Sequence, residues 1–191
     1  MAYNIKDVFY LSTSADVTKA TAGVGSAQLD LSAYIDPIAR GRTKGTGLAI
    51  YKVHWVVQDD SDSDPVAMAE TGIMSYGLIA GAGLGDNATG AIAATEATFS
   101  ATNALMVSGG AFYGPGAVGG DPDNLGAMKP VVSYVEPSTE VPYVVVRDNV
   151  CLVYNVATQF AAGAIIGCRL ECAQISLDQA TLNQLLRTQT V

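Results

Sequence analysis

The feature that most constrains this chain is a hydrophobic period of two, interrupted by glycine-rich connectors. Residues 48–58 show it most clearly, because polar side chains at Lys52, His54 and Gln58 alternate with apolar ones. Successive side chains of a β-strand point to opposite faces of its sheet, so this pattern predicts a strand with one buried face. The side chains that we expect on that buried face are Ala49, Tyr51, Val53, Trp55 and Val57.

Similar runs recur along the whole chain. We expect further strands at residues 7–11, 27–35, 66–80, 104–113, 130–135, 143–147, 150–156 and 164–175. Most of the 20 glycines lie in the connectors between these runs. Asp148 and Asn149 separate two Val- and Tyr-rich runs, and both residue types tolerate positive φ, so they predict a tight hairpin turn. Many short strands with little helix indicate an all-β sandwich or barrel.

One helix is signalled, at the C-terminal end of the sequence. Ser176 and Gln179 have the spacing of a capping box, in which the serine caps the helix and the glutamine reaches back to it. Leu182, Leu185 and Leu186 then recur at helical spacing. With 191 residues and no linker, the chain has the length of one domain.

The composition indicates a protein that buries surface against other subunits. Apolar residues make up 49% of the chain and charged residues only 15%, against roughly 25% in a typical soluble domain. We expect no membrane span, because no window of about 18 uninterrupted apolar residues exists, and no secretory signal. The net charge of −8 argues against a nucleic-acid binder held by phosphate contacts, so we expect no sequence-specific nucleic-acid binding.

An acidic stretch is the first candidate site. Asp60, Asp62 and Asp64 match the first three ligand positions of an EF-hand calcium loop. The sixth position should be Gly and is Pro65, and the twelfth should be Glu and is Thr71. We therefore interpret the stretch as a solvated turn that ends a strand, with a cation site as the alternative.

The single histidine and the three cysteines are the other residues with potential chemistry. His54 lies on the polar side of its strand, and no nucleophile motif accompanies it, so we expect no catalytic triad and no enzyme. Cys151, Cys168 and Cys172 lack the C-x₂-C spacing of a zinc site, and we expect buried free thiols. No cofactor is expected.

A second candidate site is basic. Arg40, Arg42 and Lys44 gather three of the ten basic residues in a glycine-rich loop. Such a patch can contact phosphate, of a lipid headgroup or a genome, or it can form salt bridges between subunits. A solvated loop is the simpler interpretation.

The chain as a whole resembles viral jelly-roll capsid proteins, in particular the small single-jelly-roll major capsid subunits of archaeal and thermophilic-phage icosahedral viruses. The stretch DLSAYIDPIARGRTKGTGLAIYKVHWVV, in which two strand patterns flank a glycine-rich loop, carries the resemblance together with the sparse charge. It implies an extended N-terminal arm at residues 1–21, a jelly roll of about eight strands at residues 22–175, and a C-terminal helix and tail at residues 176–191. No motif is specific enough to carry over functional residues.

The function that the resemblance implies is assembly. The subunit would be made in the host cytoplasm and would pack laterally with copies of itself, as pentamers, hexamers or larger species, into an icosahedral virion shell. A second capsid protein or minor virion protein and an internal membrane are further partners that it allows. One alternative is a trimeric β-rich phage tail or receptor-binding module, and another is an enzyme with a sugar-binding sandwich, which would need a cleft of paired carboxylates.

Overall fold

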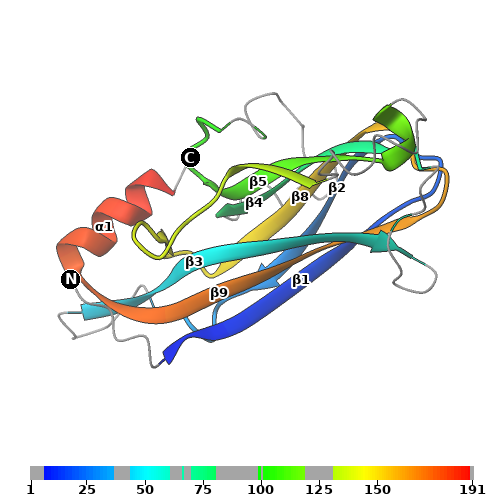
Figure 1. The fold of residues 1–191 in the computed structure, drawn as a ribbon. Coiled ribbons are helices and arrows are strands. Elements are labelled where there is room, and N and C mark those ends of the chain that lie inside the picture. The colour runs from blue at the N-terminus through cyan, green and yellow to red at the C-terminus, as the bar shows by residue number, and fades with distance from the viewer. Residues whose placement is uncertain are drawn as a thin grey trace.

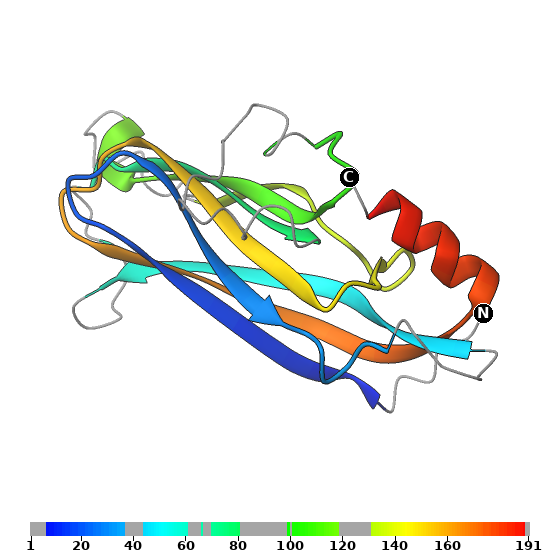
Figure 2. The ribbon, with the colours of Figure 1, turned by 180° about the vertical axis from the view of Figure 1, so that it is seen from behind.

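The structure, a computed structural model, describes residues 7–36, 44–60, 66, 70–80, 99, 101–118 and 131–189. Their strands form two antiparallel sheets that face each other, and a helix lies at one end of the sandwich (Figure 1; Figure 2 shows the reverse side). The expectation of an all-β sandwich is therefore confirmed.

The two sheets contain four and five strands. Sheet A has the order β1 (Phe9–Val17), β9 (Ala164–Asp178), β3 (Lys44–Asp59) and β7 (Tyr143–Val145). Sheet B has the order β2 (Gly23–Asp30), β8 (Asn149–Thr158), β4 (Ile73–Ala80), β5 (Met106–Tyr113) and β6 (Val131–Val135). A short 3₁₀ helix, η3 (Pro115–Val118), follows β5, and the helix α1 (Gln179–Thr188) follows β9.

The strands pair in a nested series. With β6 set aside, the first strand pairs with the last, the second with the second to last, and so on inward, as β1–β9, β2–β8, β3–β7 and β4–β5. Every one of these pairs is antiparallel. This is the pairing of one long hairpin that has been folded over into two layers, and β6 extends the β5 edge of sheet B.

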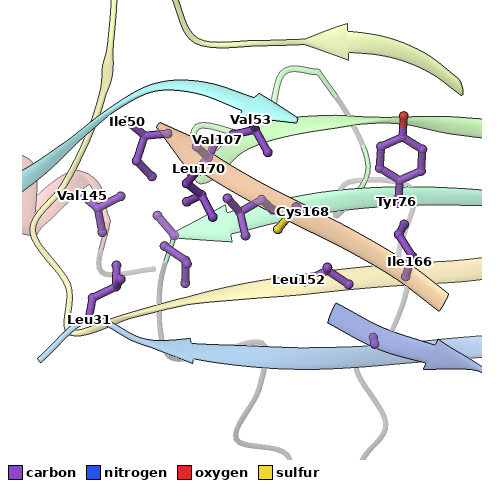
Figure 3. Close-up of a cluster of buried hydrophobic side chains, with 14 of the residues drawn as sticks. Leu31, Ile50, Val53, Tyr76, Val107, Val145, Leu152, Ile166, Cys168 and Leu170 are labelled. Carbon is purple, nitrogen blue, oxygen red and sulfur yellow. The ribbon is translucent and has the colours of Figure 1, made fainter. Parts of the chain in front are cut away.

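The main core fills the space between the sheets. Sheet A contributes Ile50, Val53 and Leu170, and sheet B contributes Tyr76 and Leu152, all buried, as Figure 3 shows. Trp55 joins the two layers, because its Nε1–H donates to the hydroxyl of Ser108 on β5 at 2.9 Å. Its ring also lies 4.5 Å from that of Tyr76, between centroids. The expectation that Trp55 lies on the core-facing side of its strand is therefore confirmed.

A β-bulge in β3 corrects the predicted core face. The register of β3 on β9 shifts between Ile50 and Lys52, so the strand changes face there. Val53, Trp55 and Val57 face the main core, as expected. Ala49 and Tyr51 do not: they pack on the opposite face of sheet A, in a separate cluster with Ala173.

The N-terminal segment that we expected as an arm contains a strand of the sandwich. Within residues 1–21, β1 pairs along its full length with β9, from Phe9 opposite Cys172 to Val17 opposite Ala164. Ala15 and Val17 are buried in the core. The sandwich therefore begins before the expected boundary at residue 22.

Three local predictions were wrong because tertiary pairing overrides them. Asp148 and Asn149 do not form a hairpin, since β7 pairs in sheet A and β8 in sheet B. Ser176 does not cap the helix, because it is held in β9 opposite Thr46; Asp178 is the cap and accepts from the Thr181 amide at 2.7 Å. The predicted strand at 27–35 is shifted, because β2 ends at Asp30 and the following residues form a turn.

Candidate functional surface

The outer face of sheet A carries an ordered array of side chains on β1, β9 and β3. Because the three strands pair in register, the outward residues form four rows. These rows are Tyr10–Glu171–Lys52, Ser12–Arg169–His54, Ser14–Gly167–Val56 and Asp16–Ile165–Gln58. We call these twelve positions the outer array.

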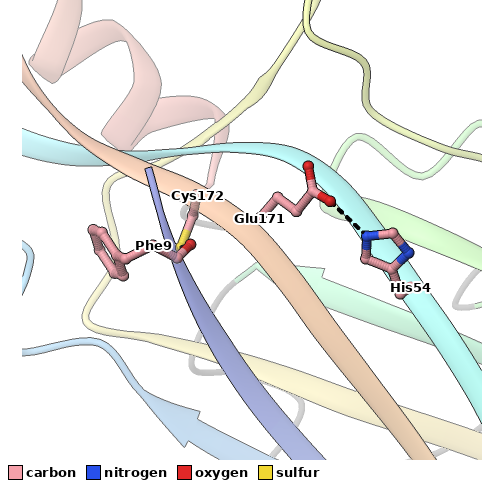
Figure 4. Close-up of polar contacts among 4 residues, drawn as sticks. All are labelled: Phe9, His54, Glu171 and Cys172. Atoms are coloured by element: carbon pink, nitrogen blue, oxygen red, sulfur yellow. Dashed lines mark hydrogen bonds and ion pairs between the residues drawn. The ribbon is translucent and has the colours of Figure 1, made fainter. Parts of the chain in front are cut away.

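Two contacts organise the charged end of the outer array. The His54 Nε2–H donates to Glu171 Oε1 at 2.7 Å, diagonally across β3 and β9 (Figure 4). The guanidinium of Arg169 lies over the Tyr10 ring, 4.2 Å from its centroid. Both pairs are open to solvent, since the His54 and Glu171 side chains are 44% and 30% exposed. The prediction that Lys52 and His54 face away from the core is confirmed.

An open depression of about 550 Å³ lies beside these contacts. Gly167 is one of the residues that line it, and a Cβ added there would meet Val56 Cγ1 at 3.2 Å. The other side chains around it belong mostly to the outer array and include Ser12, Ser14 and His54.

The positive charge of the outer array lies at its Lys52 end, while its opposite end carries Asp16. The part of the chain that the structure describes holds six Lys and Arg residues, Lys19, Lys44, Lys52, Arg147, Arg169 and Arg187. Two of them, with the only histidine, surround the single carboxylate of Glu171. The chain as a whole has a net charge of −8.

The opposite sheet presents a second exposed surface, at its β6 edge. Tyr113, Val132 and Tyr134 are 39%, 40% and 49% exposed and lie on β5 and β6. Together with Val8, Tyr10, Val56 and Val141, they are the large exposed hydrophobic residues of the described chain. Elsewhere on the outer side of sheet B, Ile79, Cys151 and Val153 are buried under Phe99 and Leu105.

Sequence reasoning missed Glu70, a buried carboxylate with several backbone partners. Its side chain is only 3% exposed, and its carboxylate accepts from the amides of Gly72, Ala161 and Ala162 at 2.8–3.2 Å. Ala161 and Ala162 lie 91 and 92 residues from Glu70 in the sequence, so no local pattern could reveal these bonds. Glu70 ties the segment before β4 to the β8–β9 connection, which is a structural role.

The predicted acidic and basic sites are described only in part. Asp60 is exposed and its amide donates to the Gly163 carbonyl at 3.3 Å, one residue beyond the last β3–β9 pair, while Asp62 and Asp64 lie outside the described residues. Lys44 is the first residue of β3, opposite Asp178, while Arg40 and Arg42 lie outside the described residues. Among the residues described, no group of three or more His, Cys, Asp or Glu could hold a metal ion.

The cysteines are buried free thiols, as predicted. All three are buried and none is in a disulfide. Burial raises the pKa of Cys168 and of Cys172 to about 12, and it also raises the pKa of Cys151. Because the thiolate is the nucleophile and the metal ligand, these side chains are poorly suited to either role near neutral pH.

The sequence was compared with protein families and with curated proteins. No protein-family model matches the chain, and none of the curated proteins gives a significant match. No helix within the described ranges is long and apolar enough to cross a membrane.

Proposed function

We propose that this chain is a structural virion protein, built on a single jelly roll, that self-assembles through lateral subunit contacts into an icosahedral capsid shell. The observation that carries the proposal is the nested strand pairing. A jelly roll is a double-sheet sandwich of eight strands made of two Greek keys, and eight of the nine strands here pair from first with last to fourth with fifth.

The exposed surfaces support an assembling subunit. Edge strands with open apolar side chains favour pairing with other chains, and soluble monomers usually protect them. Here the edge strand β6 presents Val132 and Tyr134, and the edge strand β1 presents Tyr10. These edges lie on different sheets, so one subunit can contact two neighbours at once.

The sparse charge supports the same proposal. A charged fraction of 15% means that few charged side chains must lose their hydration when subunits pack laterally. A standard interface buries about 1,600 Å² in total, and several such contacts on each subunit would together close a shell by mass action. The net charge of −8 keeps free subunits apart until their concentration is high enough.

Size-exclusion chromatography with light scattering tests the proposal. A capsid subunit gives shells, or pentamers and hexamers, whose proportion grows with concentration. A discrete trimer that does not grow would instead support the alternative, a phage tail or receptor-binding module. A monomer at every concentration and ionic strength would contradict both.

A further inference from the structure

The outer array of sheet A combines three properties that together describe a docking surface. It is cationic at one end, it is hollowed at its centre, and two of its charged side chains, Arg169 and Glu171, already make contacts within the array. These properties indicate the chemistry of what binds there.

The charge of the array points to an acidic partner. The titratable and charged groups at the His54 end are Lys52 on β3, Arg169 and Glu171 on β9, and Tyr10 on β1. Two permanent cations therefore outweigh one carboxylate at this end, and the other carboxylate of the array, Asp16, lies in the row farthest from it. Over the whole chain, by contrast, 18 acidic residues outnumber 10 basic ones.

The geometry of Arg169 suits carboxylate binding. The guanidinium is held over the Tyr10 ring, and its N–H groups form a planar fork of donors. A guanidinium held in this way loses little further side-chain entropy when it binds, and its fork of donors matches a carboxylate. Ser12 and Ser14 add exposed hydroxyls beside the depression.

We propose that the outer array docks onto an acidic surface of a second copy of this chain, with Arg169 and Lys52 receiving its carboxylates. The inference rests on the proposed function, since it names one of the lateral contacts of the shell. Charge complementarity selects this occupant, because a copy of the chain is itself strongly acidic and is the partner present at the highest concentration during assembly.

Substitutions that each remove one positive or one negative charge from the array test the docking surface. Arg169→Gln and Lys52→Gln each remove a cation from the array, and Glu171→Gln removes its carboxylate while keeping an oxygen that can accept from His54. Arg187→Gln on α1 and Lys19→Gln in the β1–β2 connection make the same charge change elsewhere and serve as matched controls. All five side chains are at least partly exposed, so we expect each variant to fold.

The measurement is the protein concentration at half-assembly, followed by light scattering. We expect Arg169→Gln and Lys52→Gln to raise it about two- to fivefold per contact, and Glu171→Gln to lower it, whereas both controls leave it near the wild-type value. High ionic strength should remove these differences.

The failure of this inference can be distinguished from the failure of the proposed function. If the wild-type protein assembles but Arg169→Gln and Lys52→Gln behave like the controls, the docking surface is wrong and the capsid function stands. A shift by Glu171→Gln in the same direction as the cation variants would also overturn the docking surface. If the wild-type protein does not associate under any condition, both proposals fall.

Discussion

Replacing Glu70 by Gln tests how this sandwich holds its connections together. The Glu70 carboxylate is buried, and it accepts hydrogen bonds from three backbone amides in two segments. One oxygen receives Gly72 and Ala161, and the other receives Ala161 and Ala162. A glutamine has the same shape but presents one oxygen and one NH₂ group, so it cannot accept on both sides.

The magnitude follows from the number of bonds. A hydrogen bond to a charged group contributes about 1.5–3 kcal/mol, and a neutral one about 0.5–1.5 kcal/mol. Glu70→Gln converts two charge-assisted bonds to neutral ones and sets the NH₂ group against the Ala162 amide. After allowing for the lower desolvation cost of a neutral side chain, we expect a loss of about 3 kcal/mol, a large share of the 5–15 kcal/mol typical of a domain.

Urea unfolding below the assembly concentration measures this loss. Glu140→Gln is the matched control, because Glu140 is exposed and its substitution should change stability by less than about 0.5 kcal/mol. In thermal unfolding, the Glu70 variant should melt about 6–12 °C lower, at roughly 2–4 °C per kcal/mol for a chain of this size. Equal stability of the two variants would refute the assignment of Glu70 as the link between these segments.

Three further predictions concern the core and the sheets. Trp55→Phe removes the donor to the buried Ser108 hydroxyl and should lower the free energy of unfolding by about 1–3 kcal/mol in urea; an unchanged midpoint would contradict the link between the layers. Gly110→Ala places a methyl group against the Val132 carbonyl of β6, whereas the methyl group of Gly77→Ala has its nearest contact at 3.4 Å. Gly110→Ala should therefore lower the melting temperature more than Gly77→Ala does, and equal melting temperatures would contradict the β5–β6 pairing. The two buried thiols of β9 have a pKa raised from 9.0 to about 12, so they keep their protons in the folded state while the unfolded chain loses them above pH 9. As the pH rises from 9 to 12, each of these thiols should therefore lower the free energy of unfolding by up to about 1.4 kcal/mol per pH unit. Replacing Cys168 and Cys172 by Ala should reduce this dependence of stability on pH.

The alternating pattern predicted the strands well wherever a strand is straight. Val53, Trp55 and Val57 were placed in the core because their period of two is uninterrupted. The same pattern failed at Ala49 and Tyr51, since the bulge after Ile50 adds a residue and reverses the face. Nothing in the residue types marks that bulge, because apolar residues occupy both faces of the strand just before it.

Pairing between distant strands explains most other differences. Asp148 and Asn149 have the chemistry of a hairpin turn, but the neighbouring strands find their partners in different sheets. Ser176 has the chemistry of a helix cap, but pairing with Thr46 keeps it in a strand. In both cases a local preference worth about 1 kcal/mol yields to a ladder of backbone hydrogen bonds.

The candidate surface was predictable only on one strand. The sequence placed Lys52 and His54 together on the outward side of β3, and the structure agrees. Glu171 lies 117 residues from His54, and Ser12 and Arg169 come from two different strands. Their meeting is set by the order of strands in sheet A, which no local pattern determines.

Electron microscopy of the purified protein at rising concentration tests the central claim most directly. A jelly-roll capsid subunit should produce closed shells of uniform diameter, or rings of five or six subunits, and Arg169→Gln should require a higher concentration to form them. Fields that show only separate single subunits, at concentrations and ionic strengths where the chain is folded, would contradict the account.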